Sequence, residues 1–551
     1  INPKDGYKVK TTGTISISIK DGNSPLISAN ATVGSKSFSL SDFESGSASV
    51  KVADLGVSNG ATVNISVTAS NSIGSSSESA TVIVDDTVKI DKFTWDNALI
   101  YFVMTDRFYN GNSSNDTSYG RVKTDCKGKN IGTFHGGDIA GLTQKLDYLD
   151  DLGVNAIWVT APYEQIHGWV GGGSAGDFAH YAYHGYYVLD YTAMDKNMGT
   201  VEEFRTFVNA AHEKGIRVVM DIVMNHTGYE NLKDMEEYGY GALSGGSHSW
   251  LPSGGETFHQ KPINKQGSGW DKFWGANWIR GDFNGYTSGG GDDLTKCLDY
   301  LPDFKTDSTS SEPAPAILKT KWSKETSGFE DWIIPAAKDL RKDLGLAPAV
   351  YIEKWLAAWV EEFGIDGFRC DTAKHVDKYR WKELKEICKT ALETWRKSSR
   401  ATGVAKDWDE DFWMTGECYT WYIGDGSYYG SGFDSMIDFT FNAGSGRTPG
   451  IDEWADRANK LNGSHDDGQN ALAYVSSHDT SLYRAGDMKD LGTKFVLLPG
   501  QVQIYYGDET ARPYGDGGSD STQGTRSDFN WDAVDGDINK HWKKVGKFRQ
   551  G

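Results

Sequence analysis

The chain has 551 residues, which is enough for two to four domains and a large hydrophobic core. Its formal net charge of −20 argues against a nucleic-acid partner and against an anionic membrane surface. No apolar run reaches the roughly 18 residues of a membrane span, so we expect none.

The composition therefore predicts an acidic, exported protein that handles a neutral substrate. We expect it to be extracellular, at the cell surface or periplasmic. The sequence begins with Ile1 rather than Met, which indicates a removed leader or a fragment. Five cysteines show no metal-ligand spacing, and their odd number precludes complete intramolecular pairing. We interpret Cys370 and Cys418, inside predicted strands, as small buried hydrophobic residues.

Residues 1–90 differ in composition from the rest of the chain, because they are rich in Ser, Thr, Val and Ala. Runs at 14–19, 61–67 and 80–84 alternate apolar and polar residues. This pattern predicts a small all-β sandwich, immunoglobulin- or fibronectin-like, without a disulfide. Aromatic residues that could stack on a sugar are few, so a spacer role is favoured over a sugar-binding module. They are Tyr7, Phe38 and Phe43.

From about residue 92, strand patterns alternate with amphipathic helix patterns. Eight such strands with intervening helices predict a (β/α)8 barrel of the α/β class. The helix that begins near Thr200 opens with a capping box formed with Glu203. The predicted strands are 98–106, 156–160, 217–226, 367–371, 412–419, 435–439, 471–479 and 501–509. The predicted helices are 141–152, 200–214, 350–363, 378–397, 451–461 and 487–498, with a last one from His541.

One connection, after the third barrel strand, is far longer than the others. It runs from 227 to 345 and is rich in Gly, Trp and Asp. Loops of that length are uncommon without structure of their own, so we expect an inserted domain there. The barrel then consists of residues 91–226 and 346–551.

The stretch 364–375 carries the strongest chemical signal in the chain. It reads as the end of a buried strand, on which Arg369 and Asp371 share one face because side chains alternate with period two. The neighbouring positive charge favours the ionised carboxylate, which suits a nucleophile facing a polar ligand. An ion pair that merely closes a strand is the alternative for this motif taken alone.

Polar residues gather where the predicted barrel strands end, and that face carries the active site of such barrels. One such residue could be a structural polar cap of its strand. Three carboxylates and three histidines from different strands on one rim indicate a functional site instead. The segments concerned are Asp221–His226, Asp371, Glu417, Ser477–Asp479 and, after the second strand, Ala182–Tyr187.

In order and position, these segments resemble the sequence regions of the α-amylase family, glycoside hydrolase family 13. Further motifs are similar to those of secreted and periplasmic bacterial α-amylases: Asp106-Arg-Phe, His135-Gly-Gly-Asp138 and Glu164-Gln-Ile-His-Gly-Trp169. The resemblance covers about residues 95–510. It implies an enzyme that cleaves α-1,4-glucosidic bonds of starch and maltooligosaccharides, acting as a monomer. The C-terminal β-domain usual in the family is missing from this sequence.

The resemblance implies that Asp371 is the nucleophile, Glu417 the general acid/base and Asp479 a third carboxylate that grips substrate hydroxyls. Retaining cleavage needs one ionised and one protonated carboxyl, roughly 5–5.5 Å apart. Arg369 beside Asp371 and other carboxylates near Glu417 agree with that division.

Substrate contacts follow by the same resemblance. Neutral histidines would donate to hydroxyls of the cleaved sugar, a tyrosine would stack beneath it, and Lys374 with His375 would contact the leaving-group sugars, as in members that act on α-1,4 bonds. The contact residues are Arg369, His184, Tyr186, His226, His478, Lys374 and His375.

The resemblance also implies calcium, which takes six to eight hard oxygen ligands. Asn225, Asp303 and the backbone carbonyl of His375 would form a site that pins the inserted domain to the barrel. A second loop resembles a calcium loop of cyclodextrin glucanotransferases, although an ordinary Asn/Gly turn is the alternative. Its residues are Asn110, Asn112, Asn115, Asp116 and Asp138.

Two other functions stay open. The first is a different enzyme on the same site: a glucanotransferase, or a maltogenic or cyclomaltodextrin-type hydrolase. The second is a barrel retained only to bind carbohydrate, which the presence of Asp371, Glu417 and Asp479 disfavours.

Overall fold

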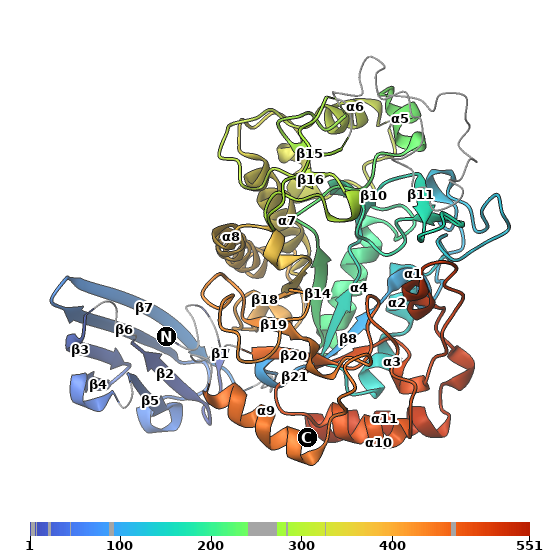
Figure 1. The fold of residues 1–551 in the computed structure, drawn as a ribbon. Coiled ribbons are helices and arrows are strands. Elements are labelled where there is room, and N and C mark those ends of the chain that lie inside the picture. Colours follow the sequence, from blue (N-terminus) through green and yellow to red (C-terminus); the bar gives the residue numbers. More distant parts are fainter. Residues whose placement is uncertain are drawn as a thin grey trace. The chain divides into compact units, whose positions relative to one another are not determined.

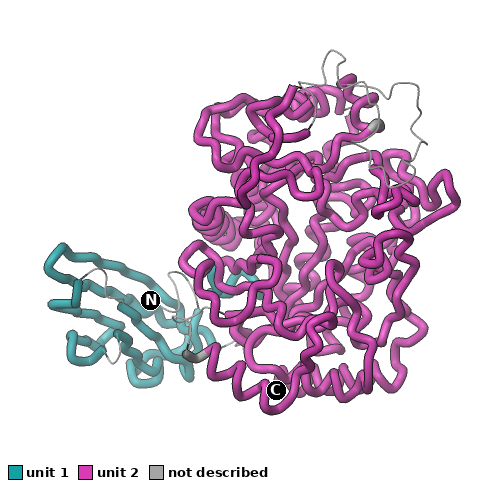
Figure 2. The backbone as a smooth tube through the Cα atoms, viewed as in Figure 1, with its two compact units in different colours: residues 1–92, 404–411 teal, residues 93–403, 412–551 magenta. Residues whose placement is uncertain are grey.

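The structure is a computed structural model. It describes all residues except 2–5, 7, 20–23, 44–45, 87–92, 241–272, 283–284, 326 and 464–469. The chain forms two compact units, one of residues 1–92 with 404–411 and one of 93–403 with 412–551 (Figure 2). Of the three aromatic residues counted in the first unit, Tyr7 lies outside the described residues.

The first unit is all-β, as predicted. One sheet has five strands in the order β1-β7-β6-β3-β4, and a second pairs β2 with β5. Alternate residues of these strands, such as Ile15, Ile17, Val63 and Ile65, are buried in a common apolar core. The strands are β1 Lys8–Val9, β2 Thr14–Ser18, β3 Leu26–Val33, β4 Lys36–Ser39, β5 Ser47–Lys51, β6 Thr62–Asn71 and β7 Ser75–Val84.

The second unit contains a closed barrel of eight parallel strands in the order β8-β9-β14-β17-β18-β19-β20-β21 (Figure 1). The predicted (β/α)8 barrel is therefore confirmed, and every predicted strand is present. The strands are β8 Leu99–Val103, β9 Ala156–Val159, β14 Arg217–Ile222, β17 Gly367–Cys370, β18 Trp413–Gly416, β19 Ser435–Asp438, β20 Asn470–Tyr474 and β21 Gln501–Tyr505.

The helices between the strands follow the predicted pattern with two differences. The helix expected over 141–152 is divided at Lys145, whose φ/ψ of −106°/8° departs from helical values. The last helix begins at Asp537, where a carboxylate in the first turn is favourable, and not at His541. The helices are α2 Ile139–Gln144, α3 Leu146–Asp151, α4 Val201–Glu213, α7 Pro348–Phe363, α8 Lys378–Lys397, α9 Ile451–Gly463, α10 Met488–Val496 and α11 Asp537–Gln550.

The predicted capping box of α4 is present. The Thr200 backbone N–H donates to Oε2 of Glu203 at 2.7 Å, and the Glu203 N–H donates to the Thr200 hydroxyl at 3.2 Å. Both bonds satisfy backbone donors that the first turn of a helix would otherwise leave open.

Smaller elements lie at one end of the barrel in Figure 1. Between β14 and α7 the chain forms helices α5 and α6 and a two-stranded sheet of β15 with β16. Between β9 and α4, β10 pairs with β13 and β11 pairs with β12. Their bounds are α5 Leu232–Tyr238, α6 Ala316–Lys324, β15 Ile279–Arg280, β16 Asp303–Phe304, β10 Tyr163–Gln165, β11 Trp169–Gly172, β12 Phe178–Tyr181 and β13 Val188–Met194.

The start of β17 is fixed by a tight approach between two helices. Gly364 ends α7 in the left-handed region (φ 72°), and a Cβ there would lie 2.4 Å from the ring of buried Trp395 on α8. Glycine is therefore the residue that both the backbone conformation and the packing require. This packing positions β17, which Asp371 directly follows.

Candidate active site

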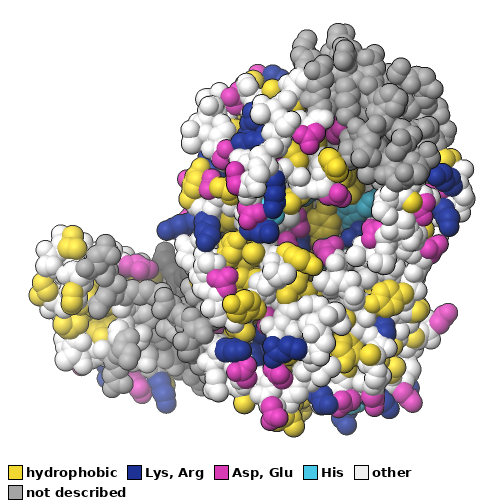
Figure 3. All heavy atoms as spheres, viewed as in Figure 1, with side chains coloured by type: hydrophobic (Ala, Val, Ile, Leu, Met, Phe, Trp, Pro, Cys, Tyr) yellow, Lys and Arg dark blue, Asp and Glu magenta, His cyan; other side chains and the backbone are white. Residues whose placement is uncertain are grey.

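A cavity of about 840 Å³ lies at the carboxyl ends of the barrel strands. Asp371 and Asp479 line it, together with His184, Tyr186 and His226. Its wall also includes residues of the β11–β12 hairpin, of 298–301 and of 519–526. Histidine side chains are visible in a hollow of the barrel unit in Figure 3. The structure thus brings five of the predicted site residues to a single cavity, whereas Glu417 and His478 are not among its lining residues.

Arg369 connects Asp371, which lines this cavity, with a second carboxylate, Asp221. Asp221 of β14 lies opposite Arg369 of β17 in the strand register. Nη1 of Arg369 lies 2.7 Å from Oδ1 of Asp371 and 3.0 Å from Oδ1 of Asp221. The Tyr186 hydroxyl donates to Oδ2 of Asp221 at 2.6 Å. All three members of the ion-pair cluster are buried, so each charge depends on its neighbours for stabilisation.

Burial shifts the pKa values of the acidic and basic members of this cluster in opposite directions. It raises the pKa of Asp221, against the effect of Arg369. It would lower the pKa of Arg369, but Asp221, Tyr186 and Asp371 outweigh it and hold that pKa well above its usual range. The guanidinium is therefore a fixed positive charge at the base of the site.

Glu417 follows β18 directly, beside Asp371. Its backbone N–H donates to the carbonyl of Cys370 at 2.8 Å, and its Oε2 accepts from the N–H of Thr372 at 3.0 Å. Burial raises the pKa of Glu417 to about 7, and Asp371 and Asp479 add to this effect while Arg369 opposes it. Glu417 is thus a carboxyl that holds a proton near neutral pH, as a general acid must.

Asp479 has the opposite tendency. Burial favours its protonated form, but His478 and Arg526 hold the pKa of Asp479 below its usual range. Nε2 of His478 lies 2.8 Å from Oδ2, and Nη2 of Arg526 lies 3.0 Å from Oδ1. The side chain is 51% exposed because it faces the open cavity.

Sequence reasoning missed Arg526. Besides its ion pair with Asp479, its Nε donates to the carbonyl of His478 at 3.2 Å. It lies in the connection between β21 and α11, where Ser, Thr, Asp and Gly predict only a loop. Gln523 of the same segment also lines the cavity. Arg526 lies 47 residues after Asp479 in the sequence, and no local sequence pattern predicts that the two side chains meet.

The other two rim histidines, His184 and His226, have different partners from His478. Nδ1 of His184 accepts from the Tyr186 N–H at 3.0 Å, so the neutral ring carries its proton on Nε2. That Nε2 is buried and has no hydrogen-bond partner among the described residues. Nε2 of His226 lies 3.2 Å from the carbonyl oxygen of Tyr186. Burial lowers the pKa of both His184 and His226, so both are neutral.

The Tyr186 ring and the ring of His478 lie nearly parallel, 5.3 Å apart at 8°. The tyrosine is half-buried and forms part of the cavity wall. Its hydroxyl is fixed by Asp221, so the ring presents a rigid apolar face, which is the feature that a stacking platform needs.

Lys374 and His375 lie apart from the main cavity lining. Lys374 lines a separate cavity of about 350 Å³ with Tyr379 and Tyr428. Nδ1 of His375 lies 2.6 Å from the carbonyl oxygen of Asp293. Neither side chain lines the cavity that holds Asp371, and their contact with the leaving-group sugars stays a prediction.

The first predicted calcium ligands converge. The terminal amide atom of Asn225 lies 3.2 Å from Oδ1 of Asp303 and 3.0 Å from the carbonyl oxygen of His375. With the amide oxygen in that position, three oxygens face one point, which fits a calcium ion; with the nitrogen there, the amide would donate to both. Asp303 is buried, and its Oδ2 accepts from Arg280 at 2.9 Å.

The second predicted calcium loop shows one feature that favours a cation and one that opposes it. The Asn115 Oδ1 is buried without a hydrogen-bond partner among the described residues, as an unused ligand would be. Asp116, however, already pairs with Nζ of Lys123 and accepts from Asn110 at 2.8 Å. Asp138 caps α2 and also accepts from the N–H of Asn112.

A parallel (β/α)8 barrel whose strand ends present carboxylates of opposed acidity and neutral histidines belongs to the class of barrel glycoside hydrolases. The family model described as "Alpha amylase, catalytic domain" matches residues 102–255 and 347–522, and the chain belongs to this family. It is accordingly an alpha-amylase family hydrolase.

Curated relatives agree with this membership. A periplasmic alpha-amylase of Escherichia coli (strain K12) is 46% identical over 481 residues, which cover 83% of this chain and 67% of the relative. An alpha-amylase of Streptomyces lividans is 29% identical over 444 residues, 73% of this chain and 43% of the relative. The chain thus spans about two thirds of one relative and less than half of the other.

Solved structures share the fold. The alpha-amylase from Geobacillus thermoleovorans complexed with acarbose aligns with a TM-score of 0.53 at 21% identity, covering 83% of this chain and 80% of that one. The cyclomaltodextrin glucanotransferase CldA gives the same values. At this identity the likeness concerns the fold alone.

The protonation of Glu417 can be measured directly. In protein labelled with carboxyl-¹³C glutamate, we expect the Glu417 resonance to titrate near pH 7, so that the group is mostly protonated at pH 6. The Glu417→Gln variant identifies the resonance by its loss. A midpoint near the ordinary glutamate value, about 4.3, would contradict the raised pKa.

Proposed function

We propose that the chain is an α-amylase that hydrolyses α-1,4-glucosidic bonds of starch and maltooligosaccharides with retention of anomeric configuration. The observation that carries this proposal is the pair of neighbouring strand-end carboxyls, Asp371 on the Arg369 ion pair and Glu417 with its pKa raised to about 7. Retaining cleavage requires such a division between a nucleophile and an acid.

In the first step, a carboxylate oxygen of Asp371 attacks the anomeric carbon while Glu417 gives its proton to the leaving glycosidic oxygen. The products are a glycosyl ester on Asp371 and a shortened glucan. In the second step, ionised Glu417 takes a proton from water, the water oxygen attacks the same carbon, and Asp371 leaves as a carboxylate.

The other cavity residues bind and orient the sugar. The unpartnered Nε2–H of His184 is a buried donor, which a substrate hydroxyl would satisfy. Tyr186 supplies the stacking face. Asp479, oriented by His478 and Arg526, accepts hydrogen bonds from the hydroxyls of the same ring.

A second candidate function is transfer or cyclodextrin cleavage on the same site. It is favoured by relatives such as a cyclomaltodextrin glucanotransferase of Geobacillus stearothermophilus, 35% identical over 159 residues, and a cyclomaltodextrinase of Thermoanaerobacter pseudethanolicus, 26% identical over 435 residues. Incubation with maltoheptaose, with and without acceptor sugars, separates transfer from hydrolysis. A barrel that only binds carbohydrate is disfavoured because Asp371, Glu417 and Asp479 are all present.

The proposal also covers the domain organisation of the chain and its cellular location. We infer that residues 227–345 form an inserted domain and that residues 1–90 act as a spacer. A location outside the cytoplasm is supported by the relative described as periplasmic. The part of the chain that the structure describes contains no helix with the length and apolar character needed to cross a membrane.

Two variants test the catalytic roles separately. Asp371→Asn should abolish cleavage of every substrate, because no nucleophile remains. Glu417→Gln should lose roughly 10²–10⁴-fold on starch, the usual contribution of a general acid. An α-glucosyl fluoride leaves without protonation, so Glu417→Gln should still form the glycosyl ester, and azide should accelerate turnover because it needs no general base. The measurement is fluoride release by both variants with and without azide.

If azide rescues Asp371→Asn and not Glu417→Gln, the two roles are reversed. If both variants keep near-normal activity on starch, the chemistry lies elsewhere in the molecule.

We also propose that Ca²⁺ binds to Asn225, Asp303 and the carbonyl of His375, where it would supply a structural link between β14, β16 and the segment after β17. Chelation should lower Tm and activity, and added Ca²⁺ should restore both, because a ligand that binds only the folded state stabilises it. Asn225→Leu should reduce the bound calcium by one equivalent.

Metal analysis of Asn115→Leu decides the second loop: a further loss of one equivalent supports a second ion, and no loss supports an ordinary turn. Unchanged Tm and activity after chelation to zero bound calcium would refute the first site.

A further inference from the structure

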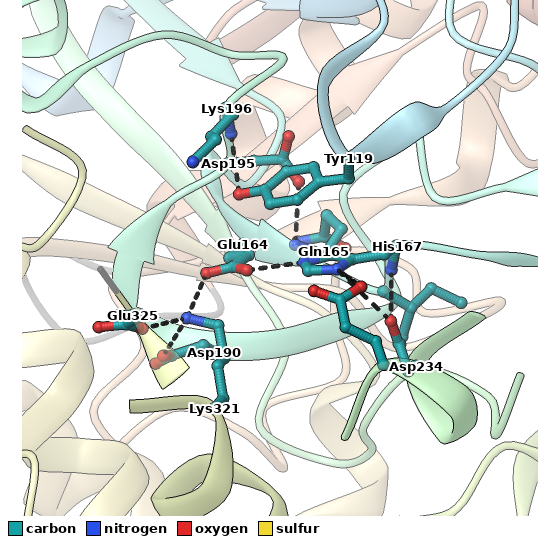
Figure 4. A network of polar contacts seen from close by, with 12 residues as sticks. Tyr119, Glu164, Gln165, His167, Asp190, Asp195, Lys196, Asp234, Lys321 and Glu325 are labelled. Atoms are coloured by element: carbon teal, nitrogen blue, oxygen red, sulfur yellow. Dashed lines mark hydrogen bonds and ion pairs between the residues drawn. The ribbon is translucent and has the colours of Figure 1, made fainter. Parts of the chain in front are cut away.

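A cluster of ligand-type side chains lies outside the catalytic cavity. One ligand atom from each of His167, Asp234 and Glu237 lies within 4.8 Å of the others. His167 follows β10, whereas Asp234 and Glu237 lie one turn apart on α5. None of the three lines the cavity that holds Asp371. Figure 4 shows His167 and Asp234 facing each other across the two elements.

The imidazole of His167 is held in one orientation. Its Nε2 lies 2.8 Å from Oε1 of Glu164, and Oε2 of Glu164 lies 2.7 Å from Nζ of Lys321. The ring stacks on Tyr119, with centroids 3.9 Å apart. A metal-binding histidine commonly donates one ring N–H to a carboxylate and, once its other nitrogen is deprotonated, offers the lone pair of that nitrogen to the ion. In this case that nitrogen is Nδ1, and it faces Asp234 and Glu237.

The network around the cluster has a surplus of negative charge. It contains five carboxylates, but the ion pairs join only two permanently charged cations to it among the described residues, Lys321 and Arg341. A further cation, Lys233 of α5, lowers the pKa of Glu237 without forming an ion pair within 4.0 Å of it. The carboxylates are Glu164, Asp190, Asp234, Glu237 and Glu325.

From this geometry we propose that His167, Asp234 and Glu237 bind a divalent transition-metal ion, with Zn²⁺ as the best fit. One imidazole and two carboxylates are a zinc-type donor set, whereas calcium takes oxygen ligands. Tetrahedral zinc with bonds of about 2.0–2.2 Å separates its ligands by about 3.4 Å. The separations here are 2.9 Å from Nδ1 to Glu237 and 3.7 Å from Nδ1 to Asp234.

The ion would join α5 to the loop after β10. Glu237 is 38% exposed, so it offers a path from solvent and leaves room for water as the fourth ligand. His167 and Asp234 are buried, and Asp234 is further held by Asn231 at 2.8 Å. The proposed ion therefore has a structural role, in which it links two segments, and takes no part in the chemistry at Asp371.

A proton is the rival occupant of this cluster. Burial alone would lower the pKa of His167, but hydrogen bonds to Glu164 and Glu237 outweigh it and raise the pKa to about 9. Without metal, the ring is then an imidazolium that bridges two carboxylates. Metal binding must displace that proton, so the two occupants differ in a measurable way.

The test uses the full chain, freed of transition metals and kept in excess Ca²⁺. Titration with Zn²⁺ by calorimetry at pH 7.5 should show one equivalent bound. Co²⁺ should give visible absorption bands that Zn²⁺ abolishes. Glu237→Gln removes a half-exposed ligand of the ion. Loss of a residue that only supports a ligand lowers metal affinity roughly 10–100-fold, so loss of this ligand should lower the affinity for Zn²⁺ by more than that.

Glu236→Gln is the matched control, because it changes the adjacent exposed glutamate of α5, and it should bind as the wild type does. Circular dichroism shows whether each variant is folded. The proposal is overturned if the folded wild type binds no Zn²⁺ in excess Ca²⁺, which leaves the proton as the occupant. It is also overturned if Glu237→Gln binds as tightly as Glu236→Gln, which places the ion elsewhere.

Discussion

The Arg369 guanidinium is the charge around which the catalytic rim is arranged. It lies between Asp221 and Asp371 on adjacent strands, and all three residues are buried. A buried cation of this kind is costly unless each of its partners is in place, so it fixes the relative position of β14 and β17. Tyr186 is attached to the same cluster through Asp221, which links the position of its ring to that of Asp371.

Neighbouring carboxyls around this cation have different acidities because their partners differ. Glu417 is buried near two other carboxyls, which raises its pKa to about 7 against the opposing effects of Arg369 and of the Thr372 N–H that it accepts. Asp479 has His478 and Arg526 as partners, which keep its pKa low. Similar side chains thereby become suited to giving a proton and to accepting hydrogen bonds.

Much of this arrangement was predictable from the sequence, because barrel strands and their polar ends carry local patterns. The eight strands, the capping box at Thr200 and the contact of Arg369 with Asp371 are all present in the structure. The predictions depended on alternation and on residue type at strand ends, which are properties of short segments.

Features that depend on distant contacts were not predictable. Arg526 contacts Asp479 from a loop with no distinctive sequence pattern. The helix is broken at Lys145, where no Pro or Gly predicts a break. The turn after β17 places Lys374 on a separate cavity and His375 against the carbonyl of Asp293, partners that the sequence did not indicate, and the contact of both side chains with a sugar stays a prediction. The orientation of a side chain beyond a strand end depends on tertiary packing that spacing does not encode.

The central claim is that Asp371 forms a covalent bond to the sugar and that Glu417 assists both steps. The most direct measurement is ¹H NMR of the anomeric protons during the first minutes of maltooligosaccharide hydrolysis, before mutarotation equilibrates the products. Two displacements at the same carbon predict that the α-anomer appears first. Initial formation of the β-anomer would mean a single displacement by water, and would contradict the role of Asp371 as nucleophile.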